Sequence, residues 1–407
     1  MVDLGEMKNF YKDKRVLVTG HTGFKGAWLC RLLLDMGAKV YGYALAPERE
    51  SLYGLLDWEK GLVSCYGDIR QPKKLGAFVK KAEPEVIFHL AAQPLVSVGY
   101  AQPVKTYETN LMGTVYLLEA LRKVENLRSV VVVTTDKVYA ETKEAAGEES
   151  PLGGFDPYAN SKSCAELAAA CYGRCFFEGK AALSRLRAGN VIGGGDFAPH
   201  RILPDCIRAA VERKPVILRH PEGVRPYQHV LEPLTAYLWT AWKQWGAPEL
   251  ADCYNVAPKG EDISNGELAG LFCKYWGDGM KWQAKPADFP REQTVLRLNG
   301  QKIQEKLGWV PRWNVEQAVS ATVAWTKVWQ RGGDLAEEMC REATAYEKGE
   351  WILRKRKQDG KSWRRYGNIT TVSMTGNAGT GSMCPMAAGF ITKGKWRISP
   401  KPCWILV

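Results

Sequence analysis

Two residues one helical turn apart have the chemistry to move a proton. Tyr158 follows directly after Pro157, at the start of a stretch with a helical pattern, and Lys162 lies four residues further along. Residues four apart share one face of a helix, so the Lys162 ammonium can lower the pKa of the Tyr158 phenol electrostatically. The phenolate could then take the proton of a hydroxyl group while a neighbouring acceptor takes a hydride from the same carbon. Such pairs are also common on helix surfaces, so the hypothesis requires an acceptor site elsewhere in the chain.

A glycine-rich loop is a candidate site for that acceptor. The apolar segment 16–19 runs directly into Gly20, Gly23 and Gly26, and an apolar helical segment follows over 27–36. Glycines at this spacing allow a sharp turn, a close approach of the backbone to a pyrophosphate, and tight packing of helix on strand. The N–H groups at the start of the helix then face the phosphates. Between a strand and a helix, the loop predicts dinucleotide binding rather than an ordinary tight turn.

Strand and helix patterns alternate through the first half of the chain. Strands are predicted at 15–19, 39–45, 62–66, 85–90, 129–135 and 181–188, and helices at 25–36, 72–81, 104–124 and 158–177. The strands are nearly continuous apolar runs, which is typical of a parallel sheet buried on both faces. The pattern predicts an α/β fold, a Rossmann-type doubly wound parallel sheet.

The pattern changes after residue 192. Short strands are predicted at 215–218 and 253–256, and helices at 203–212, 264–276, 300–307 and 315–329. Ser264 and Glu267 have the spacing of a capping box at the start of one of these helices. We predict a dinucleotide-binding domain over 1–192, to which later segments return, and a smaller α+β substrate-binding domain over 193–350. The smaller domain is expected to cover the carboxyl ends of the strands, where open α/β sheets bind ligands.

The positive charge of the chain is concentrated in its last residues. Residues 351–407 hold eleven Lys and Arg against one acid, Asp359, which gives this tail +10 and leaves +2 for the first 350 residues. We therefore expect no nucleic-acid binding by the first 350 residues. The tail also lacks periodicity, which predicts either a disordered extension or translation of a shifted or fused reading frame.

Other bulk features argue against a membrane or metal protein. No apolar stretch reaches the about 18 residues of a membrane span. Eleven cysteines are scattered without a Cys-x-x-Cys pair, which favours free thiols in a reducing cytoplasm over a disulfide framework or a zinc site. We expect a cytoplasmic protein that binds neither a metal nor a membrane.

Taken together, the motifs resemble the extended short-chain dehydrogenase/reductase family over residues 10 to 345. The resemblance rests on the glycine loop and on the segments 67–69, 89–93, 109–110, 134–139, the Tyr158/Lys162 pair and Asn190. In the second half, 225–233 and 307–311 are similar to the sugar-nucleotide branch. The loop form His-Thr-Gly-Phe-Lys-Gly and the stretch Arg-Pro-Tyr-Gln-His-Val-Leu-Glu-Pro further resemble dehydratases that act on CDP-glucose.

The resemblance implies NAD as the cofactor. The residues that it assigns to NAD are Gly20, Thr22, Gly23, Phe24, Gly26, Asp68, Ile69, Leu90, Ala91, Ala92, Tyr158 and Lys162. The second strand does not by itself distinguish NAD from NADP. It ends Tyr-Gly-Tyr-Ala-Leu without the acid that would accept from a ribose hydroxyl, and Arg49 downstream could suit a 2′-phosphate.

The resemblance also implies a 4,6-dehydration that would feed deoxysugar synthesis for surface polysaccharide. Tyr158 would be the base at C4, Lys162 its electrostatic partner, and Thr135 a hydroxyl that orients O4. Asp136 would protonate the departing C6 hydroxyl, because burial favours its protonated form. Lys137 would be the C5 base, which requires its neutral form. The dTDP-glucose dehydratases have Asp-Glu here, whereas UDP-N-acetylglucosamine 4,6-dehydratases also have Asp-Lys; the alternative is a strand-end ion pair.

Several polar residues are candidates for binding the nucleotide-sugar, with CDP-glucose as the implied substrate. Arg225 is the best candidate for the diphosphate, because a guanidinium can bind two phosphate oxygens at once. Arg201 and Asn190 are weaker candidates, and Gln93 and Asn110 could touch the sugar or the nicotinamide. Each of these residues alone could equally be a structural hydrogen-bonder.

Other functions stay open from the sequence. A nucleotide-sugar 4-epimerase would share Tyr158 and Lys162 but would need no Asp136/Lys137 pair. A catalytically silent NAD-binding regulator is disfavoured by the intact Thr135, Tyr158 and Lys162 set. The basic segment 354–357 could attach the chain to RNA or a membrane surface. The family resemblance suggests a homodimer or homotetramer built from the predicted helices 104–124 and 158–177.

Overall fold

The computed structural model describes residues 4–58, 61–142, 144–260, 262–285 and 295–351 of the 407-residue chain. The tail predicted from residue 351 onward lies, apart from its first residue, outside these ranges. Within them, no helix is long and apolar enough to cross a lipid bilayer. The first 354 residues form one compact unit, and the division at residue 192 stays a prediction.

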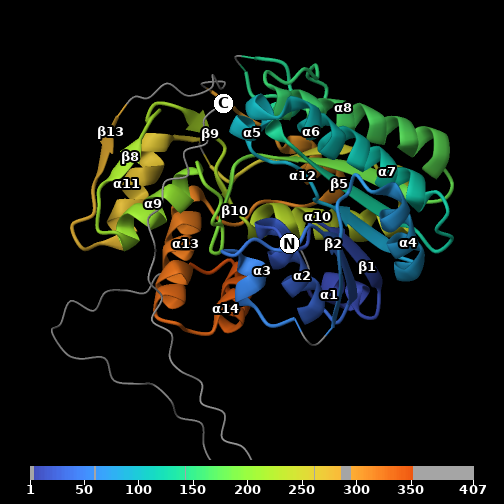
Figure 1. Cartoon of the computed structure of the whole chain (residues 1–407), viewed down its shortest axis with the longest axis horizontal. Helices are drawn as coiled ribbons and strands as arrows, with labels where there is room; N and C mark the ends of the chain where they lie inside the picture. The colour runs from blue at the N-terminus through green and yellow to red at the C-terminus, as the bar shows by residue number, and fades with distance from the viewer. Residues whose placement is uncertain (1–3, 59–60, 143, 261, 286–294, 352–407) are drawn as a thin grey trace, which may run out of the picture. The chain divides into compact units, whose positions relative to one another are not determined.

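A seven-stranded parallel sheet forms the centre of this unit (Figure 1). Its strands lie in the order β11-β6-β5-β4-β1-β2-β3, and every neighbouring pair is parallel. The strands are β1 (Arg15–Thr19), β2 (Lys39–Ala44), β3 (Leu62–Tyr66), β4 (Val86–His89), β5 (Ser129–Thr135), β6 (Ala182–Ala188) and β11 (Cys253–Val256). The predicted fold class is confirmed.

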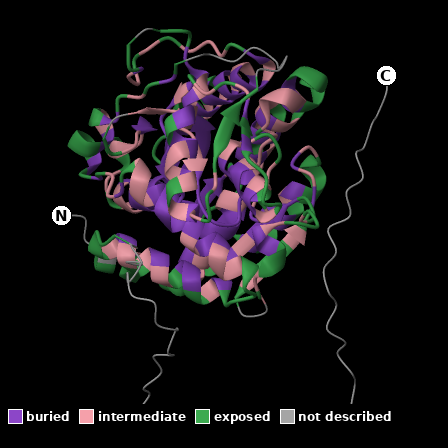
Figure 2. Ribbon diagram, turned by 90° about the vertical axis from the view of Figure 1, so that its left-hand side faces the viewer, coloured by how far each residue is buried: buried purple, intermediate pink, exposed green. Residues whose placement is uncertain are grey.

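Helices cover both faces of the sheet because successive strand residues point to opposite faces. On β1, Val16 and Val18 pack into one core, whereas Leu17 packs into the other. The first core is covered by α1 (Leu4–Tyr11), α2 (Phe24–Asp35), α10 (Leu231–Gly246), α12 (Gln301–Leu307), α13 (Val315–Gln330) and α14 (Leu335–Lys348). The second is covered by α4 (Pro72–Ala82), α7 (Gly113–Leu121) and α8 (Pro157–Tyr172). Figure 2 shows buried residues gathered in the interior and exposed residues on the outer helices and loops.

A smaller group of elements lies beyond the carboxyl ends of the strands and has its own core. Two helices, α9 (Ile202–Val211) and α11 (Asn265–Trp276), pack there with one face of α13. Short strand pairs complete it: β13 (Trp282–Ala284) with β8 (Val216–Leu218), β12 (Ile263–Ser264) with β9 (Val224–Arg225), and β10 (Gln228–His229) with β7 (Val191–Ile192). The predicted capping box of Ser264 and Glu267 is confirmed at the start of α11.

The structure differs from the predicted elements in three ways. The predicted helix 104–124 is divided into α6 (Pro103–Tyr107), a π-helical turn η1 (Glu108–Met112) and α7, and α8 likewise ends in a π-helical turn, η3 (Gly173–Phe177). The segment 253–256 is an edge strand of the main sheet rather than part of the smaller group. Helices or helical turns absent from the prediction are α1, α3 (Leu52–Leu55), α5 (Val96–Ala101), η2 (Asp136–Val138), α10, η4 (Pro248–Leu250) and α14.

Candidate active site

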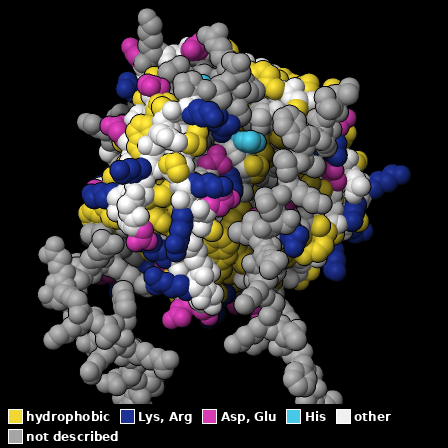
Figure 3. All heavy atoms as spheres, turned by 60° about the vertical axis from the view of Figure 1, so that its left-hand side comes forward, with side chains coloured by type: hydrophobic (Ala, Val, Ile, Leu, Met, Phe, Trp, Pro, Cys, Tyr) yellow, Lys and Arg dark blue, Asp and Glu magenta, His cyan; other side chains and the backbone are white. Residues whose placement is uncertain are grey.

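A cleft of about 640 Å³ lies between the carboxyl ends of the central strands and the smaller group of elements. Its wall combines the end of β5, the segment after β6, the start of α8 and the region from α9 to β9. The predicted site residues that line it are Phe24, Thr135, Asp136, Lys137, Tyr158, Asn190, Arg201 and Arg225. Figure 3 shows one face of the molecule, on which basic, acidic and apolar side chains are mixed.

The glycine loop is built for close approach of its backbone to neighbouring groups. Gly20 has a φ of +77°, and a Cβ there would lie 2.8 Å from the Ala91 backbone nitrogen. A Cβ on Gly26 would lie 2.1 Å from the Gly20 carbonyl oxygen. Gly23 is the N-cap of α2 and has no side chain to occupy the helix N-terminus. These residues therefore fit a pyrophosphate bound at the helix N-terminus.

Further residues expected to bind NAD lie next to this loop at the ends of β2, β3 and β4. Thr22 donates from Oγ1 to the Leu45 carbonyl over 3.0 Å, beyond the end of β2. The Asp68 carboxylate is held by Arg70, whose hydrogen bonds lower the pKa of Asp68. Ile69 is buried against Gly113. The segment 90–92 follows β4, where the Leu90 amide donates to the Thr19 carbonyl.

Thr135 and Asp136 stand at the end of β5, on the cleft wall. The Thr135 hydroxyl donates to Oδ1 of Asp136 over 2.9 Å. Asp136 is 3% exposed, and its Oδ2 has no hydrogen-bond partner among the described residues. Burial raises the pKa of Asp136, although the nearby charges of Lys137 and Arg225 act in the opposite direction. A buried carboxyl with a raised pKa and one uncommitted oxygen is suited to donate a proton.

Tyr158 stands in the first turn of α8, which Asp156 caps by accepting from the Tyr158 and Ala159 amides. Burial raises the pKa of Tyr158 to about 12, and a hydrogen bond with Thr135 lowers it in part. The Lys162 Nζ donates to the Val133 carbonyl over 3.1 Å, and burial lowers the pKa of Lys162 to about 8. Burial of the phenol therefore dominates the pKa of Tyr158, and the expected lowering of this pKa by Lys162 stays a prediction.

Basic side chains also line the cleft. Arg201 donates from Nη1 to Oδ2 of Asp196 over 3.1 Å, and Arg225 on β9 is 7% exposed. Lys25 also lines the cleft. Burial and the charges of Lys162 and Arg201 lower its pKa to about 7. The sequence analysis did not assign Lys25, although its place one residue before Gly26 in the loop was a usable signal.

Gln93 and Asn110 are not brought to the cleft wall. The Asn110 side chain accepts from the backbone N–H of Gln93 over 2.8 Å and donates to Oγ of Ser161 over 2.9 Å. The Gln93 side chain donates to Thr106 and accepts from the Leu95 amide. Because the amide groups of both side chains are occupied within the chain, the structure favours the structural alternative for these two residues over substrate contact.

The chain is similar to known sugar-nucleotide enzymes. A family model described as GDP-mannose 4,6 dehydratase matches residues 17–322. The CDP-glucose 4,6-dehydratase of Salmonella typhimurium is 43% identical over 351 residues, which cover 83% of this chain and 98% of that protein. The solved UDP-glucose 4-epimerase of Thermus thermophilus in complex with NAD has a TM-score of 0.67 and 26% identity, covering 77% of this chain and 98% of that one. The dTDP-glucose 4,6-dehydratase of Streptomyces venezuelae has the same fold, with a TM-score of 0.68 and 24% identity over 79% of this chain and 99% of that one.

Proposed function

The chain belongs to the GDP-mannose 4,6-dehydratase family, in the sugar-nucleotide branch of the extended short-chain dehydrogenases/reductases, and on that premise we propose that it is a CDP-glucose 4,6-dehydratase. The enzyme converts CDP-glucose to CDP-4-keto-6-deoxyglucose and water. The observation that carries this function is the 43% identity to the Salmonella enzyme over nearly its whole length. The cleft supports it, because Thr135, Asp136, Lys137 and Tyr158 line one wall.

NAD is the cofactor, and the glycine loop is its proposed binding site. The similar Thermus epimerase was solved as a complex with NAD. The space left by Gly20, Gly23 and Gly26 and the open N-terminus of α2 fit the pyrophosphate. When bound, NAD supplies the group that accepts a hydride from C4 of the sugar and returns it to C6.

The first chemical role belongs to Tyr158. We propose that its phenolate removes the proton from the C4 hydroxyl while Thr135 holds the same oxygen. The pKa of about 12 makes the phenolate costly to form, so the cationic surroundings of the phenol must stabilise it in the transition state. Arg201 lowers the pKa of Tyr158 in this way, and Lys162 stands one turn further along α8.

Elimination of water requires a second acid and base on the same wall. The ketone at C4 acidifies the C5 proton, which Lys137 removes in its neutral form in this proposal. Asp136 gives its proton to the C6 hydroxyl, which leaves as water. The raised pKa of Asp136 supports the acid role, because the carboxyl must hold a proton near neutral pH to donate one.

Arg225 and Arg201 are the proposed ligands of the diphosphate, with Asn190 beside the sugar. All three side chains line the cleft, and a guanidinium binds phosphate oxygens in pairs. The cytidine preference rests on the Salmonella relative.

We propose a homodimer or homotetramer in the cytoplasm. Val104 on α6 is 71% exposed and Leu167 on α8 is 61% exposed, and the proposed contact between copies would cover both side chains. The nine described cysteines are free thiols, in agreement with a reducing compartment. Light scattering on the purified protein measures the assembly directly.

The function is tested by incubating the purified full-length protein with NAD and a panel of nucleoside-diphosphate glucoses without added reductant. Mass spectrometry should detect the loss of one water from CDP-glucose and little change in the UDP, dTDP and GDP compounds. Loss of water from another member of the panel would replace cytosine by the nucleobase of that compound in the proposed substrate. Conversion to a 4-epimer of unchanged mass would replace the dehydratase by an epimerase.

A further inference from the structure

A third polar residue shares the helical face that carries Tyr158 and Lys162. Glu166 lies one turn beyond Lys162 on α8 and is 1% exposed. A buried carboxylate is costly unless it is paired and hydrogen-bonded. The partners of Glu166 therefore show what the residue does for the site.

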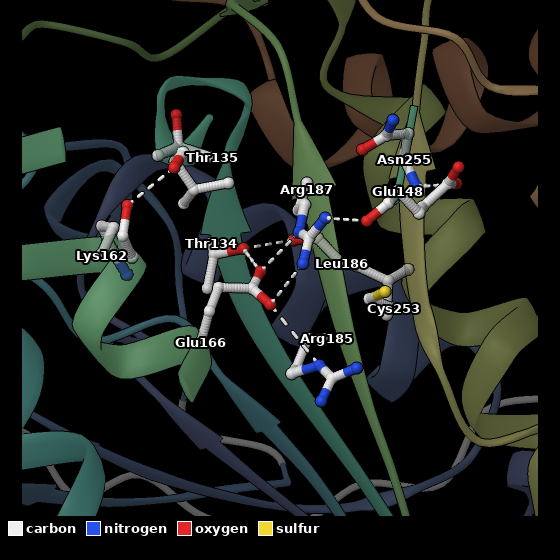
Figure 4. A network of polar contacts seen from close by, with 12 residues as sticks. Thr134, Thr135, Glu148, Lys162, Glu166, Arg185, Leu186, Arg187, Cys253 and Asn255 are labelled. Carbon is white, nitrogen blue, oxygen red and sulfur yellow. Dashed lines mark hydrogen bonds and ion pairs between the residues drawn. The ribbon is translucent and has the colours of Figure 1, made fainter. Parts of the chain in front are cut away.

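Glu166 joins α8 to strands β5 and β6. Arg187 donates from Nε to Oε1 and from Nη2 to Oε2, both over 3.0 Å. Thr134 donates its hydroxyl to Oε1 over 2.5 Å, and Arg185 lies 3.4 Å from Oε2. Figure 4 shows the Glu166 carboxylate between Thr134 on one strand and the two arginines on the next.

Three consecutive residues of β5 are consequently bound to one face of α8. The Val133 carbonyl accepts from Lys162 over 3.1 Å, Thr134 donates to Glu166, and Thr135 is hydrogen-bonded to Tyr158. These contacts set the register between the end of the strand and the helix. On β5, the residue bound by Glu166 lies directly between those bound by Lys162 and Tyr158.

The same network reaches the far side of the turn that holds Asp136 and Lys137. Arg187 donates from Nη1 to the Tyr139 hydroxyl over 2.7 Å, and Tyr139 donates to Oδ1 of Asn255 over 2.6 Å. Arg187 also donates to the Glu148 carbonyl over 3.2 Å. Residues on both sides of the turn η2 are therefore bound by the ion pair: Glu166 binds Thr134 before the turn, and Arg187 binds Tyr139 after it.

We propose that Glu166 and Arg187 are positioning residues of the dehydration, which hold the turn of Asp136 and Lys137 and keep the Lys162 ammonium against β5. This inference rests on the proposed function for its reaction but not for its geometry. A buried ion pair of this kind adds little net stability and is often replaceable by apolar side chains. The role assigned to this pair is therefore the geometry that it imposes on the turn of Asp136 and Lys137.

The charge of Glu166 provides a readout that a merely structural residue would not move. Glu166 raises the pKa of Lys162 against the effect of burial, so Glu166→Gln should lower that pKa by about one unit. Competitive labelling of Lys162 with acetic anhydride across pH, followed by peptide mass spectrometry, measures this without any turnover. Glu166→Asp keeps the charge and should leave the labelling midpoint near that of the native protein.

In the turnover assay, Glu166→Gln should lower kcat for CDP-glucose by about 10- to 100-fold with KM changed less than about threefold. The alkaline limb of its pH profile should move to lower pH, because Lys162 then loses its proton earlier. The matched control is Glu338→Gln. Like Glu166, Glu338 is a buried carboxylate bound by an arginine, here Arg341. It lies on α14, outside the cleft lining, so neither kcat nor the pH midpoint of Lys162 labelling should change.

Loss of folding is separated from loss of positioning by the double variant Glu166→Met with Arg187→Met. Its apolar side chains should restore the melting temperature while kcat and the Lys162 midpoint stay low. The proposal would be overturned if Glu166→Gln kept the native kcat and the native pH midpoint of Lys162 labelling. Full recovery of both quantities in the double variant would overturn it as well. If the native protein removes no water from any nucleotide-sugar, the proposed function fails instead. The pH midpoint of labelling then still shows whether Glu166 raises the pKa of Lys162.

Discussion

The Thr135 hydroxyl donates to the Asp136 carboxylate over 2.9 Å, so that one hydroxyl is bonded both to the candidate acid and, through a second hydrogen bond, to Tyr158. The two candidate proton-transfer groups of the site are therefore coupled through a single side chain. This relationship follows from the meeting of β5 with the first turn of α8.

Replacement of Thr135 by Val should lower kcat by about 10- to 100-fold. The hydrogen bond with Thr135 lowers the pKa of Tyr158, so its loss raises that pKa and moves the acidic limb of the rate profile to higher pH. Thr135→Ser keeps the hydroxyl and should retain most of the activity. Equal profiles for the Val and Ser variants would argue against a role of the hydroxyl.

Replacement of Asp136 by Asn should reduce water elimination by between about 100- and 10,000-fold, while oxidation at C4 still produces reduced nicotinamide absorbance. The variant should also change stability. Because the folded pKa of Asp136 is raised, the folded state binds more protons than the unfolded one, and native stability falls as pH rises toward the folded pKa.

Chemical denaturation from pH 4 to 8 checks this linkage. The free energy of unfolding of the native protein should fall relative to Asp136→Asn by up to about 1.4 kcal/mol per pH unit within that window. A constant difference between the two proteins across pH would show that Asp136 does not titrate there.

Replacement of Lys137 by Met should abolish loss of water and leave oxidation at C4 detectable. The reason is that the C5 proton then has no base, whereas Tyr158 and Thr135 are unchanged. Lys123→Met, at an exposed position outside the cleft lining, is the control and should behave as the native enzyme. Unchanged release of water by the Lys137 variant, measured by mass spectrometry, would reduce Asp136 and Lys137 to a strand-end ion pair.

Replacement of Asn110 by Ala should destabilise the protein by about 1–3 kcal/mol, because the Gln93 backbone N–H loses its acceptor and the Ser161 hydroxyl, which still donates to the Tyr158 carbonyl, loses a donor. KM for CDP-glucose should stay within about twofold, since Asn110 does not line the cleft. Asn190→Ala, which does alter the lining, should show the opposite pattern. A large rise of KM in the Asn110 variant would restore the substrate role predicted from the sequence.

The fold could be predicted where local patterns were strong. The first six strands were found because short stretches rich in β-branched and other apolar residues, such as 130–133, lie between turn segments, and α2 and α8 because glycine and proline mark their starts. Helix α10 was missed because residues 231–241 are buried all round, so the chain shows no alternation of apolar and polar faces there. The edge strand β11 was misplaced because pairing between distant strands leaves no local signal.

The sequence by itself determined the chemistry that is available: the glycine loop, the spacing of Tyr158 and Lys162, and the Asp136–Lys137 pair at a strand end. These depend on neighbours within one or two turns, where spacing sets geometry. Only the tertiary structure decided that burial raises the pKa of Tyr158 and that the Asn110 side chain binds the backbone of Gln93. It likewise decided that Glu166 on helix α8 pairs with Arg187 on strand β6. Burial and long-range pairing depend on the packing of the whole chain, which no single segment encodes.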